Sequence, residues 1–317
     1  MPRFRDHPLS TALGAGVLTG AAALTYAAGY EVRAFTLRRV EVACLPAGHR
    51  PLRVLHISDL HMTPSQHRKQ AWLRSLARLD PDLVVVTGDN LAHLAAVPVV
   101  LDGMTDLLGR PGVFVFGSND YYSPQLRNPL KYLTRDDGKR NTDTPKLPFE
   151  NLRKGFLDGG WLDLNNDRGR LDVAGTSIAF TGVDDPHLRL DDLSTVQPAP
   201  YDVDLRVGVT HAPYLRVLDA FAAQGYELSF AGHTHGGQVC LPFYGTLVTN
   251  CDIDRTRAKG LHRHPADSAP DDAGSTWLHV SAGAGTSPYA PIRFCCRPEA
   301  SLVTLQPVTA GVLADVA

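Results

Sequence analysis

The sequence contains little cysteine, and its cysteines follow no regular spacing. Five cysteines occur in 317 residues, and an odd number without a repeated interval argues against a disulfide framework. No Cys-x-x-Cys pair is present, which excludes a zinc ribbon. Cys295 and Cys296 are neighbours, and adjacent cysteines rarely bridge each other. We therefore expect mostly reduced thiols, which favours a cytoplasmic catalytic domain.

The chain also lacks a surplus of basic residues. Lys and Arg number 31 against 33 Asp and Glu, so the formal net charge is −2 and predicts no broad attraction to nucleic acid. With 44% hydrophobic and 20% charged residues, the composition is that of a globular protein. A length of 317 residues is compatible with one large α/β core. A nucleic-acid partner is therefore not expected.

The N-terminal segment over residues 9–30 carries no charged side chain, and arginines flank it on both sides. Its length suits one membrane-spanning helix, although glycine and hydroxyl residues make it weakly hydrophobic. A membrane anchor is the favoured interpretation. A cleaved signal peptide, with small residues around 21–23, and an Ala/Gly-rich helix packed on the domain remain open. Slightly more arginines follow the segment than precede it, which favours a cytoplasmic over an extracytoplasmic catalytic domain.

Beyond the N-terminus, short apolar runs alternate with helical patterns. We expect an anchor or signal-like helix over 1–30, a linker over 31–51 and a catalytic domain over 52–310. Strands are predicted at 52–57, 83–87, 112–116, 177–182, 205–209, 228–231, 277–281 and 301–305, and helices at 71–79 and 97–108. Surface loops are predicted at 191–204 and 262–275, and a long polar loop at 121–148. The alternation predicts a layered α/β domain.

Ligand-type side chains follow four of the predicted strands: Asp59, His61, Asp89, His211, His233 and His235. In an extended segment, side chains at i and i+2 point the same way, so Asp59 and His61 should meet one ion. The glycines around His233 and His235 allow that loop to bend, so that each imidazole serves a different ion. His56 lies inside the first strand, where we expect it to pack in the core.

These residue types favour a particular group of metals. Mixed oxygen and nitrogen ligands suit Mn²⁺, Fe²⁺, Zn²⁺ or Co²⁺ better than calcium, and Mn²⁺ is our first candidate. Two such ions about 3.5–4 Å apart hold a hydroxide nucleophile and neutralise a phosphoryl group in line. A single Asp-x-His usually marks a turn, but the ordered set, each member at a strand end, favours a dinuclear metal site.

The ordered motifs resemble those of the calcineurin-like metallophosphoesterases: Asp59-Leu60-His61, Gly88-Asp89-Asn90, Gly117-Ser118-Asn119-Asp120, His211 and Gly232-His233-Thr234-His235. The resemblance covers about residues 52–306. The continuation Gly-Gly-Gln-Val with Leu241-Pro242-Phe243 is similar to the membrane-associated bacterial branch, which includes phosphodiesterases and UDP-2,3-diacylglucosamine hydrolases. The resemblance implies an α/β fold, a four-layer α/β/β/α sandwich with two metals at the strand ends, here preceded by the N-terminal hydrophobic helix.

The resemblance also implies a set of ligands. One metal would be held by Asp59, His61 and His235, and Asp89 would bridge to a second metal held by Asn119, His211 and His233. The family usually has Gly-Asn-His-Asp where this chain has Gly117-Ser118-Asn119-Asp120, so the usual histidine is missing. Either the loop shifts by one residue and Asn119 ligates, or Ser118 ligates poorly. We expect Asn119, because an amide oxygen is the better ligand, and we take Asn119 and Asp120 as candidate catalytic residues.

Candidate substrate-binding residues lie in two segments. Asp185 and His187 follow the strand at 177–182 and could line the pocket, although an Asp-Pro turn is the structural alternative. Arg127 and Lys131 lie in the long polar loop, where residues 128–133 would form either an apolar lid for an acyl chain or a self-packed loop.

Together these features predict a dinuclear metal-dependent hydrolase that cleaves a phosphodiester or pyrophosphate bond through a metal-bound hydroxide. The membrane segment points to a lipid-linked substrate. The alternative is a metal-binding protein of the same fold with weak or no catalysis, which only the altered Gly-Ser-Asn-Asp loop supports. A nuclease is disfavoured because the sequence has no basic patches.

Overall fold

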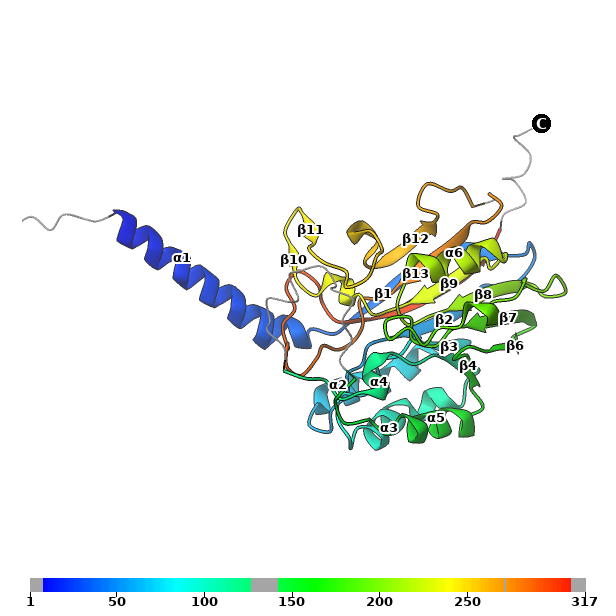
Figure 1. Ribbon diagram of the computed structural model, residues 1–317, viewed down its shortest axis with the longest axis horizontal. Helices are drawn as coiled ribbons and strands as arrows, with labels where there is room; N and C mark the ends of the chain where they lie inside the picture. The colour runs from blue at the N-terminus through cyan, green and yellow to red at the C-terminus, as the bar shows by residue number, and fades with distance from the viewer. Residues whose placement is uncertain (1–7, 127–141, 271, 309–317) are drawn as a thin grey trace, which may run out of the picture.

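The computed structural model describes residues 8–126, 142–270 and 272–308, and it consists of two stacked sheets with helices on both outer faces (Figure 1). The first sheet has the order β1 (Thr36–Leu45), β14 (Glu299–Pro307), β2 (Leu52–Ile57), β3 (Leu83–Val86), β4 (Gly112–Phe114) and β5 (Leu162–Asp163). The second has the order β12 (Gly260–His264), β13 (Thr276–Val280), β9 (Leu228–Ala231), β8 (Leu205–Val209), β7 (Thr176–Gly182) and β6 (Arg168–Val173).

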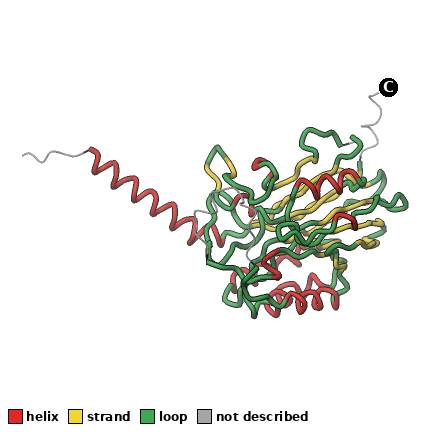
Figure 2. Tube along the Cα trace, in the orientation of Figure 1, coloured by secondary structure: helices red, strands yellow, loops and turns green. Residues whose placement is uncertain are grey.

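Helices cover the sheets from opposite sides, so strands lie between two helical layers in Figure 2. The first sheet is covered by α2 (His67–Ser75), α3 (Val97–Leu108) and α5 (Phe149–Asp158), and the second by α6 (Leu215–Ala223). Shorter elements lie at the edge: α4 (Ser118–Tyr121), the hairpin of β10 (Cys240–Leu241) and β11 (Gly245–Thr246), and single 3₁₀ turns at Glu31–Arg33, Leu76–Leu79, Leu193–Thr195, His235–Gly237 and Arg255–Arg257. The predicted α/β class is confirmed.

The central strands are apolar on both faces because both faces are buried. Successive side chains of a strand point to opposite sides, so Val54 of β2 faces the second sheet while Leu55 packs against the outer helices. The same alternation places Val85 between the sheets and Val84 under α3. On β8, Gly208 allows a close approach of α6, since a Cβ there would lie 2.5 Å from Phe221.

The prediction that residues 31–51 form a linker is wrong. Residues Thr36–Leu45 form β1, which pairs in parallel with β14 from Thr36 opposite Glu299 to Val42 opposite Leu305. The apolar alternation of Val40, Val42 and Cys44 was obscured by the neighbouring charged side chains, which point to solvent from this edge strand. The prediction of a loop at 262–275 is also wrong in part, because its first three residues belong to β12.

The N-terminal helix α1 (Pro8–Thr25) leads away from the sheets, and a π-helical turn over Tyr26–Tyr30 joins it to the domain (Figure 1). No helix in the described ranges is long and apolar enough to cross a membrane, so the predicted membrane-spanning helix is not supported. The junction is well packed: the Glu31 carboxylate accepts from the backbone N–H groups of Cys295 and Cys296 at 3.0 and 2.5 Å.

Candidate metal centre

The loops after β2, β3 and β9 carry their ligand-type side chains on an unusual backbone. Five non-glycine residues there have left-handed φ values between 41° and 68°: Asp59, His61, Asp89, His233 and His235. This conformation is sterically unfavourable for residues with a Cβ and is concentrated at functional sites in proteins. The extended i, i+2 geometry that we expected for Asp59 and His61 is therefore wrong, although their side chains converge. Tight turns, not pleating, bring them together.

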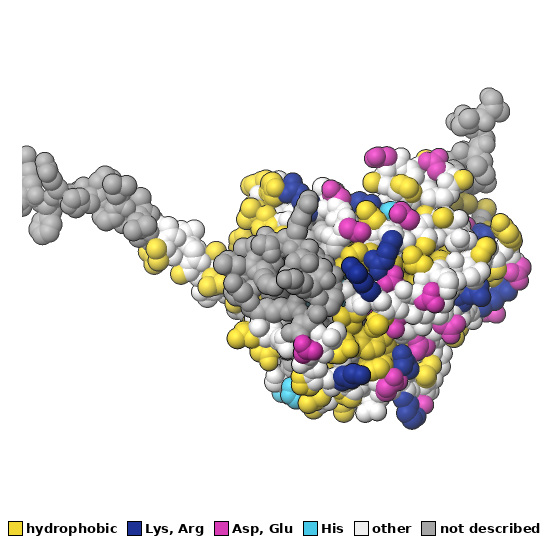
Figure 3. Space-filling view, viewed as in Figure 1, with side chains coloured by type: hydrophobic (Ala, Val, Ile, Leu, Met, Phe, Trp, Pro, Cys, Tyr) yellow, Lys and Arg dark blue, Asp and Glu magenta, His cyan; other side chains and the backbone are white. Residues whose placement is uncertain are grey.

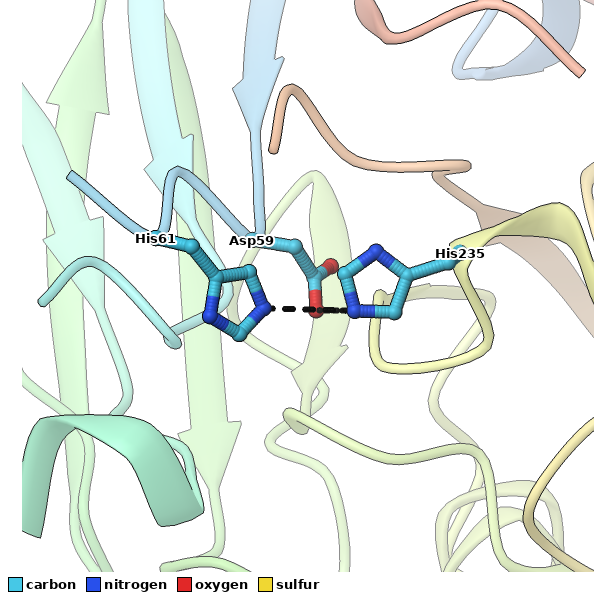
Figure 4. Close-up of side chains that lie close together, drawn as sticks. All are labelled: Asp59, His61 and His235. Carbon is cyan, nitrogen blue, oxygen red and sulfur yellow. Dashed lines mark hydrogen bonds and ion pairs between the residues drawn. The ribbon is translucent and has the colours of Figure 1, made fainter. Parts of the chain in front are cut away.

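One convergent group consists of Asp59, His61 and His235, whose ligand atoms all lie within 4.8 Å of one another. Figure 4 shows the two imidazoles and the carboxylate pointing toward one another from the loops after β2 and β9. The Nε2 atoms of His61 and His235 are 3.2 Å apart, and His235 Nε2 lies 3.6 Å from Asp59 Oδ1. These are the three residues expected at the first metal.

A second group shares Asp59 with the first and adds Asp89 and His211, again within 4.8 Å. Asp89 lies between two histidines: its Oδ1 is 3.5 Å from His211 Nε2, and its Oδ2 is 3.5 Å from His61 Nε2. Gly117 allows this approach, because a Cβ there would lie 2.4 Å from Asp89 Oδ1. One carboxylate oxygen thus faces each side of the centre.

Backbone carbonyls decide which imidazole nitrogens remain for a ligand. His211 Nδ1 lies 2.6 Å from the Thr87 carbonyl, so Nδ1 carries the hydrogen that donates. His235 Nδ1 similarly donates to the Gly285 carbonyl at 3.1 Å. Both rings then present Nε2 toward the carboxylates, as metal-binding histidines do.

Two buried atoms at this point have no hydrogen-bond partner within the described part of the chain: Asp59 Oδ1 and His211 Nε2. Buried polar atoms are normally paired, so two orphaned ligand-type atoms facing one centre need an external partner. Carboxylate oxygens and imidazole nitrogens are the donor set of first-row divalent cations. The residues present therefore fit such ions.

The charges of the site lead to the same conclusion. Burial by itself would lower the pKa of His211, but Asp89, Asp59 and Asp185 outweigh burial and raise it to about 9. Burial raises the pKa of Asp59 to about 6, and burial lowers that of His61 to about 4. The protein alone thus concentrates negative charge around His211, which a cation would neutralise.

His233 and His187 extend the cluster toward α6. The ring centroid of His233 lies 5.2 Å from that of His211 and 4.4 Å from that of His187. His187 Nδ1 lies 3.1 Å from the Tyr214 hydroxyl, which orients the ring. Asp185 is fully buried and accepts from the His187 N–H at 2.9 Å, so it caps the turn that carries His187.

In the altered loop, Asn119 rather than Ser118 lies against the centre. The Asn119 side-chain amide donates to Asp89 Oδ2 at 2.7 Å, and its backbone N–H donates to Asp89 Oδ1 at 2.7 Å. Asp120 is buried and accepts from the backbone N–H groups of Asn90 and Gly117 at 2.8 and 3.0 Å. These contacts join the loop after β3 to the loop after β4, so Asp120 holds the two loops in position. Its predicted catalytic role stays a prediction.

Two predicted residues cannot be placed. Arg127 and Lys131, together with the predicted lid over 128–133, lie outside the described residues. Their proposed contact with substrate therefore stays a prediction from the sequence.

Arg293 was missed by the sequence analysis. Its guanidinium is fully buried and donates to the carbonyls of Ala282, Gly283 and Gly285 at 2.7, 3.1 and 2.6 Å. It also donates to the His235 carbonyl at 3.3 Å and so fixes the loop that carries this ligand. No motif surrounds it in the sequence that would reveal this role.

Lys69, on the first turn of α2, was also missed. Its Nζ is buried and donates to the Leu60 carbonyl at 2.6 Å, between Asp59 and His61. Burial and, secondarily, Arg293 lower the pKa of Lys69 to about 7. Lys69 thereby supports the loop after β2 from the side opposite to the second sheet.

Comparison with known proteins agrees with this geometry. The family model for calcineurin-like phosphoesterase matches residues 52–237. YkuE of Bacillus subtilis, an uncharacterized metallophosphoesterase, is 25% identical over 308 residues, which cover 93% of this chain and 94% of the relative. YkoQ of the same organism, also an uncharacterized metallophosphoesterase, is 27% identical over 226 residues, or 69% of this chain and 74% of the relative.

A further relative carries a substrate in its name. The UDP-2,3-diacylglucosamine pyrophosphatase LpxG of Chlamydia trachomatis is 26% identical over 292 residues, which cover 80% of this chain and 83% of the relative. The family binds divalent metals in a dinuclear site, and the Asp and His cluster lies within the matched residues. Because the family model covers more than half of the sequence, this chain belongs to the calcineurin-like phosphoesterases and is a metal-dependent hydrolase of phosphoester bonds.

Proposed function

We propose that this protein uses two divalent cations to hydrolyse a pyrophosphate or phosphodiester bond in an amphiphilic, lipid-linked substrate. The observation that carries the two-cation reaction is the position of Asp89, whose oxygens each lie 3.5 Å from a different imidazole. A carboxylate placed between two such groups is able to bridge two cations.

The contacts support the ligand set that the sequence predicts. Asp59, His61 and His235 would hold one cation, Asn119, His211 and His233 would hold the other, and Asp89 would be shared. His233 Nε2 lies 3.2 Å from the Asn250 carbonyl and so donates there, which favours Nδ1 as its ligand atom. When bound, the pair would activate a water molecule as nucleophile and neutralise charge on the phosphoryl group, and Mn²⁺ suits this mixed ligand set.

His187 is our candidate for the proton donor to the leaving oxygen. The family's usual histidine is replaced in the Gly117–Asp120 loop, and Asn119 has no titratable proton to give. The ring of His187 is 4.4 Å from that of His233, and the Tyr214 hydroxyl holds its Nδ1. The ring of His187 thus lies beside a proposed metal ligand, which supports its role as the proton donor.

A cavity of about 320 Å³ beside the centre supports an amphiphilic substrate. Its wall combines the apolar side chains of Val32, Phe35, Pro288 and Pro291 with the cationic side chains of Arg33 and Arg68. Gly285 lines the same cavity and accepts the hydrogen bond of His235, so one wall residue contacts a proposed ligand of the first cation. Cations beside apolar walls suit an anionic head group joined to a hydrocarbon chain.

Exposed apolar side chains lie on the β10–β11 hairpin, where hydrophobic atoms gather at the upper left of the domain in Figure 3. Phe243 is completely exposed, and Leu241 and Tyr244 are also exposed. An apolar hairpin end of this kind would favour contact with a lipid surface, from which the protein would take its substrate. Membrane association through the N-terminal segment and a cytoplasmic catalytic domain stay predictions, which vesicle co-sedimentation and protease accessibility in cells would test.

The experiment is a substrate comparison with metal-free protein to which Mn²⁺ is returned. The substrates are a UDP-linked diacyl sugar, bis(p-nitrophenyl) phosphate and p-nitrophenyl phosphate, and Asp89→Asn is the control variant. We expect Mn²⁺-dependent turnover, fastest on the amphiphile and absent in the variant. Equal turnover of soluble and amphiphilic diesters would refute the lipid-linked substrate. Binding of two metal equivalents without any turnover would refute the reaction and support a metal-binding protein with weak or no catalysis.

A further inference from the structure

A buried chain of hydrogen bonds connects the second sheet to Asp59. His279 Nδ1 on β13 lies 2.9 Å from His56 Nδ1 on β2, and His56 Nε2 lies 2.8 Å from Thr87 Oγ1. Thr87 Oγ1 lies 2.7 Å from Ser58 Oγ, which lies 2.6 Å from Asp59 Oδ2. All five side chains are at most 1% exposed. The chain therefore crosses the space between the two sheets out of contact with solvent.

The donor and acceptor of every hydrogen bond in this series follow from its last member, Asp59. An ionised Asp59 only accepts, so the Ser58 hydroxyl donates to it and must itself accept from Thr87. Thr87 has then used its hydrogen and must accept from His56 Nε2. His56 therefore has its hydrogen on Nε2 and its lone pair on Nδ1.

The last link fixes the second imidazole. His56 Nδ1 accepts, so His279 must carry its hydrogen on Nδ1. The two rings thus hold opposite tautomers. Burial lowers the pKa of His56 well below its usual value and that of His279 to about 3, so both rings are neutral near pH 7.

The chain determines how the Asp59 carboxylate is turned. Oδ2 accepts from Ser58 Oγ and from the His233 backbone N–H at 3.0 Å. Oδ1 has no hydrogen-bond partner within the described residues and lies 3.6 Å from His235 Nε2. One oxygen is held by the core, and the other is left for the centre.

We propose that His279, His56, Thr87 and Ser58 form a positioning chain that turns Asp59 Oδ1 toward the metal pair and thereby sets the affinity of the site. This inference rests on the proposed function, because it takes Asp59 as a metal ligand. Burying two imidazoles is unfavourable unless their nitrogens are paired, and here each pairing points toward Asp59. Partners that orient a metal ligand typically change metal affinity about 10- to 100-fold when removed.

Three variants and one matched control test the proposal by Mn²⁺ titration calorimetry of metal-free protein. Thr87→Val keeps the side-chain shape and breaks two links, and Ser58→Ala removes the final link. Ser301→Ala is the control, because Ser301 is buried opposite His56 on β14 and its hydroxyl has no partner in the described structure. We expect Thr87→Val and Ser58→Ala to weaken binding about 10- to 100-fold, with the control within about twofold of the native protein.

The far end of the chain and the tautomers provide further readouts. His279→Leu, which removes one neutral hydrogen bond in the other sheet, should weaken binding about 2- to 10-fold. Ring ¹⁵N chemical shifts should show His56 protonated on Nε2 and His279 on Nδ1. The opposite tautomer at His56, or Mn²⁺ affinity of both Ser58→Ala and Thr87→Val within twofold of the control, would overturn the proposal. Absence of Mn²⁺ binding by the native protein would instead refute the proposed function.

Discussion

The charge on His211 predicts how metal binding depends on pH. Burial lowers the pKa of this imidazole, but the carboxylates of Asp89, Asp59 and Asp185 outweigh burial and raise it to about 9. At pH 7.5 the metal-free protein therefore holds a proton on each ring nitrogen. His211 Nδ1 donates its hydrogen to the Thr87 carbonyl at 2.6 Å, so the second proton is on Nε2, 3.5 Å from Asp89 Oδ1. A cation that takes Nε2 must displace that proton.

The magnitude follows from linkage. Below the pKa of His211, each cation bound at Nε2 releases one proton, so the affinity should rise about tenfold per pH unit. Between pH 7.0 and 8.5 this amounts to about a 30-fold increase, and the rise should level off above pH 9. Burial raises the pKa of Asp59 to about 6, so its proton contributes only at lower pH. Asp120 and Lys69, whose pKa values are about 7, have lost most of their protons by pH 8, so the rise from pH 8 to 8.5 reports His211.

Calorimetric titration with Mn²⁺ under argon, in buffers of different ionisation enthalpy, measures the protons released. We expect close to one proton at pH 7.5 from this position. Asp185→Asn removes one of the carboxylates that raise the pKa of His211 and should move the midpoint of proton release to lower pH. An affinity that stays flat from pH 7 to 8.5, or release of less than half a proton at pH 7.5, would show that His211 is neutral or does not bind the cation.

Three further predictions concern the loops and the unloaded protein. Gly117→Ala should remove at least one equivalent of bound Mn²⁺ in metal analysis, because its Cβ would lie 2.4 Å from Asp89 Oδ1 and 2.6 Å from His211 Nε2. The control Gly109→Ala, which has open space around its Cβ, should retain both equivalents of Mn²⁺. Arg293→Met should lower the free energy of unfolding by about 3–5 kcal/mol, because it leaves several buried carbonyls without donors. Urea denaturation measures this loss, with the exposed Arg297→Met as the control variant. Equal free energies of unfolding for the two variants would contradict the structural role of Arg293. In the metal-free protein the pKa of His211 is raised to about 9, so the stability that its proton contributes should be lost as the pH rises from 7 to 9. Lys69, whose pKa burial lowers to about 7, contributes in the opposite sense, so the metal-free protein is compared with the Mn²⁺-saturated protein at each pH. The melting temperature of the saturated protein should rise relative to that of the metal-free protein over this range, and a constant difference would contradict the shift assigned to His211.

The sequence predicted the central elements of the fold closely. The bounds of β2, α3, β8 and β9 coincide with those expected, because continuous apolar runs and helical periodicity give a strong local signal. The edge strands β1, β6 and β12 were not predicted as strands. They carry charged residues on an exposed face, and β1 pairs with β14, more than half of the chain away. Such strands depend on partners that no local pattern specifies.

The candidate site was predictable as a set of residues but not as a geometry. The strand-end positions of Asp59, Asp89 and His211 are visible in the sequence because parallel strands share one edge of a sheet. The left-handed turns at Asp59 and Asp89 have no counterpart in the i, i+2 argument. The role of His279 has no signal in the sequence, because its link to His56 joins residues 223 positions apart.

The left-handed backbone of the five ligand residues has a consequence for how this protein can change. At each of these positions the left-handed backbone conformation is less unfavourable for glycine than for aspartate or histidine, by about 1–2 kcal/mol of conformational free energy. A glycine replacement would therefore be tolerated, or even favoured, by the empty fold while it removes a ligand. Variants selected only for thermal stability should therefore lose metal binding early. Variants selected for bound Mn²⁺ as well should keep these residues and gain thermal stability from substitutions elsewhere.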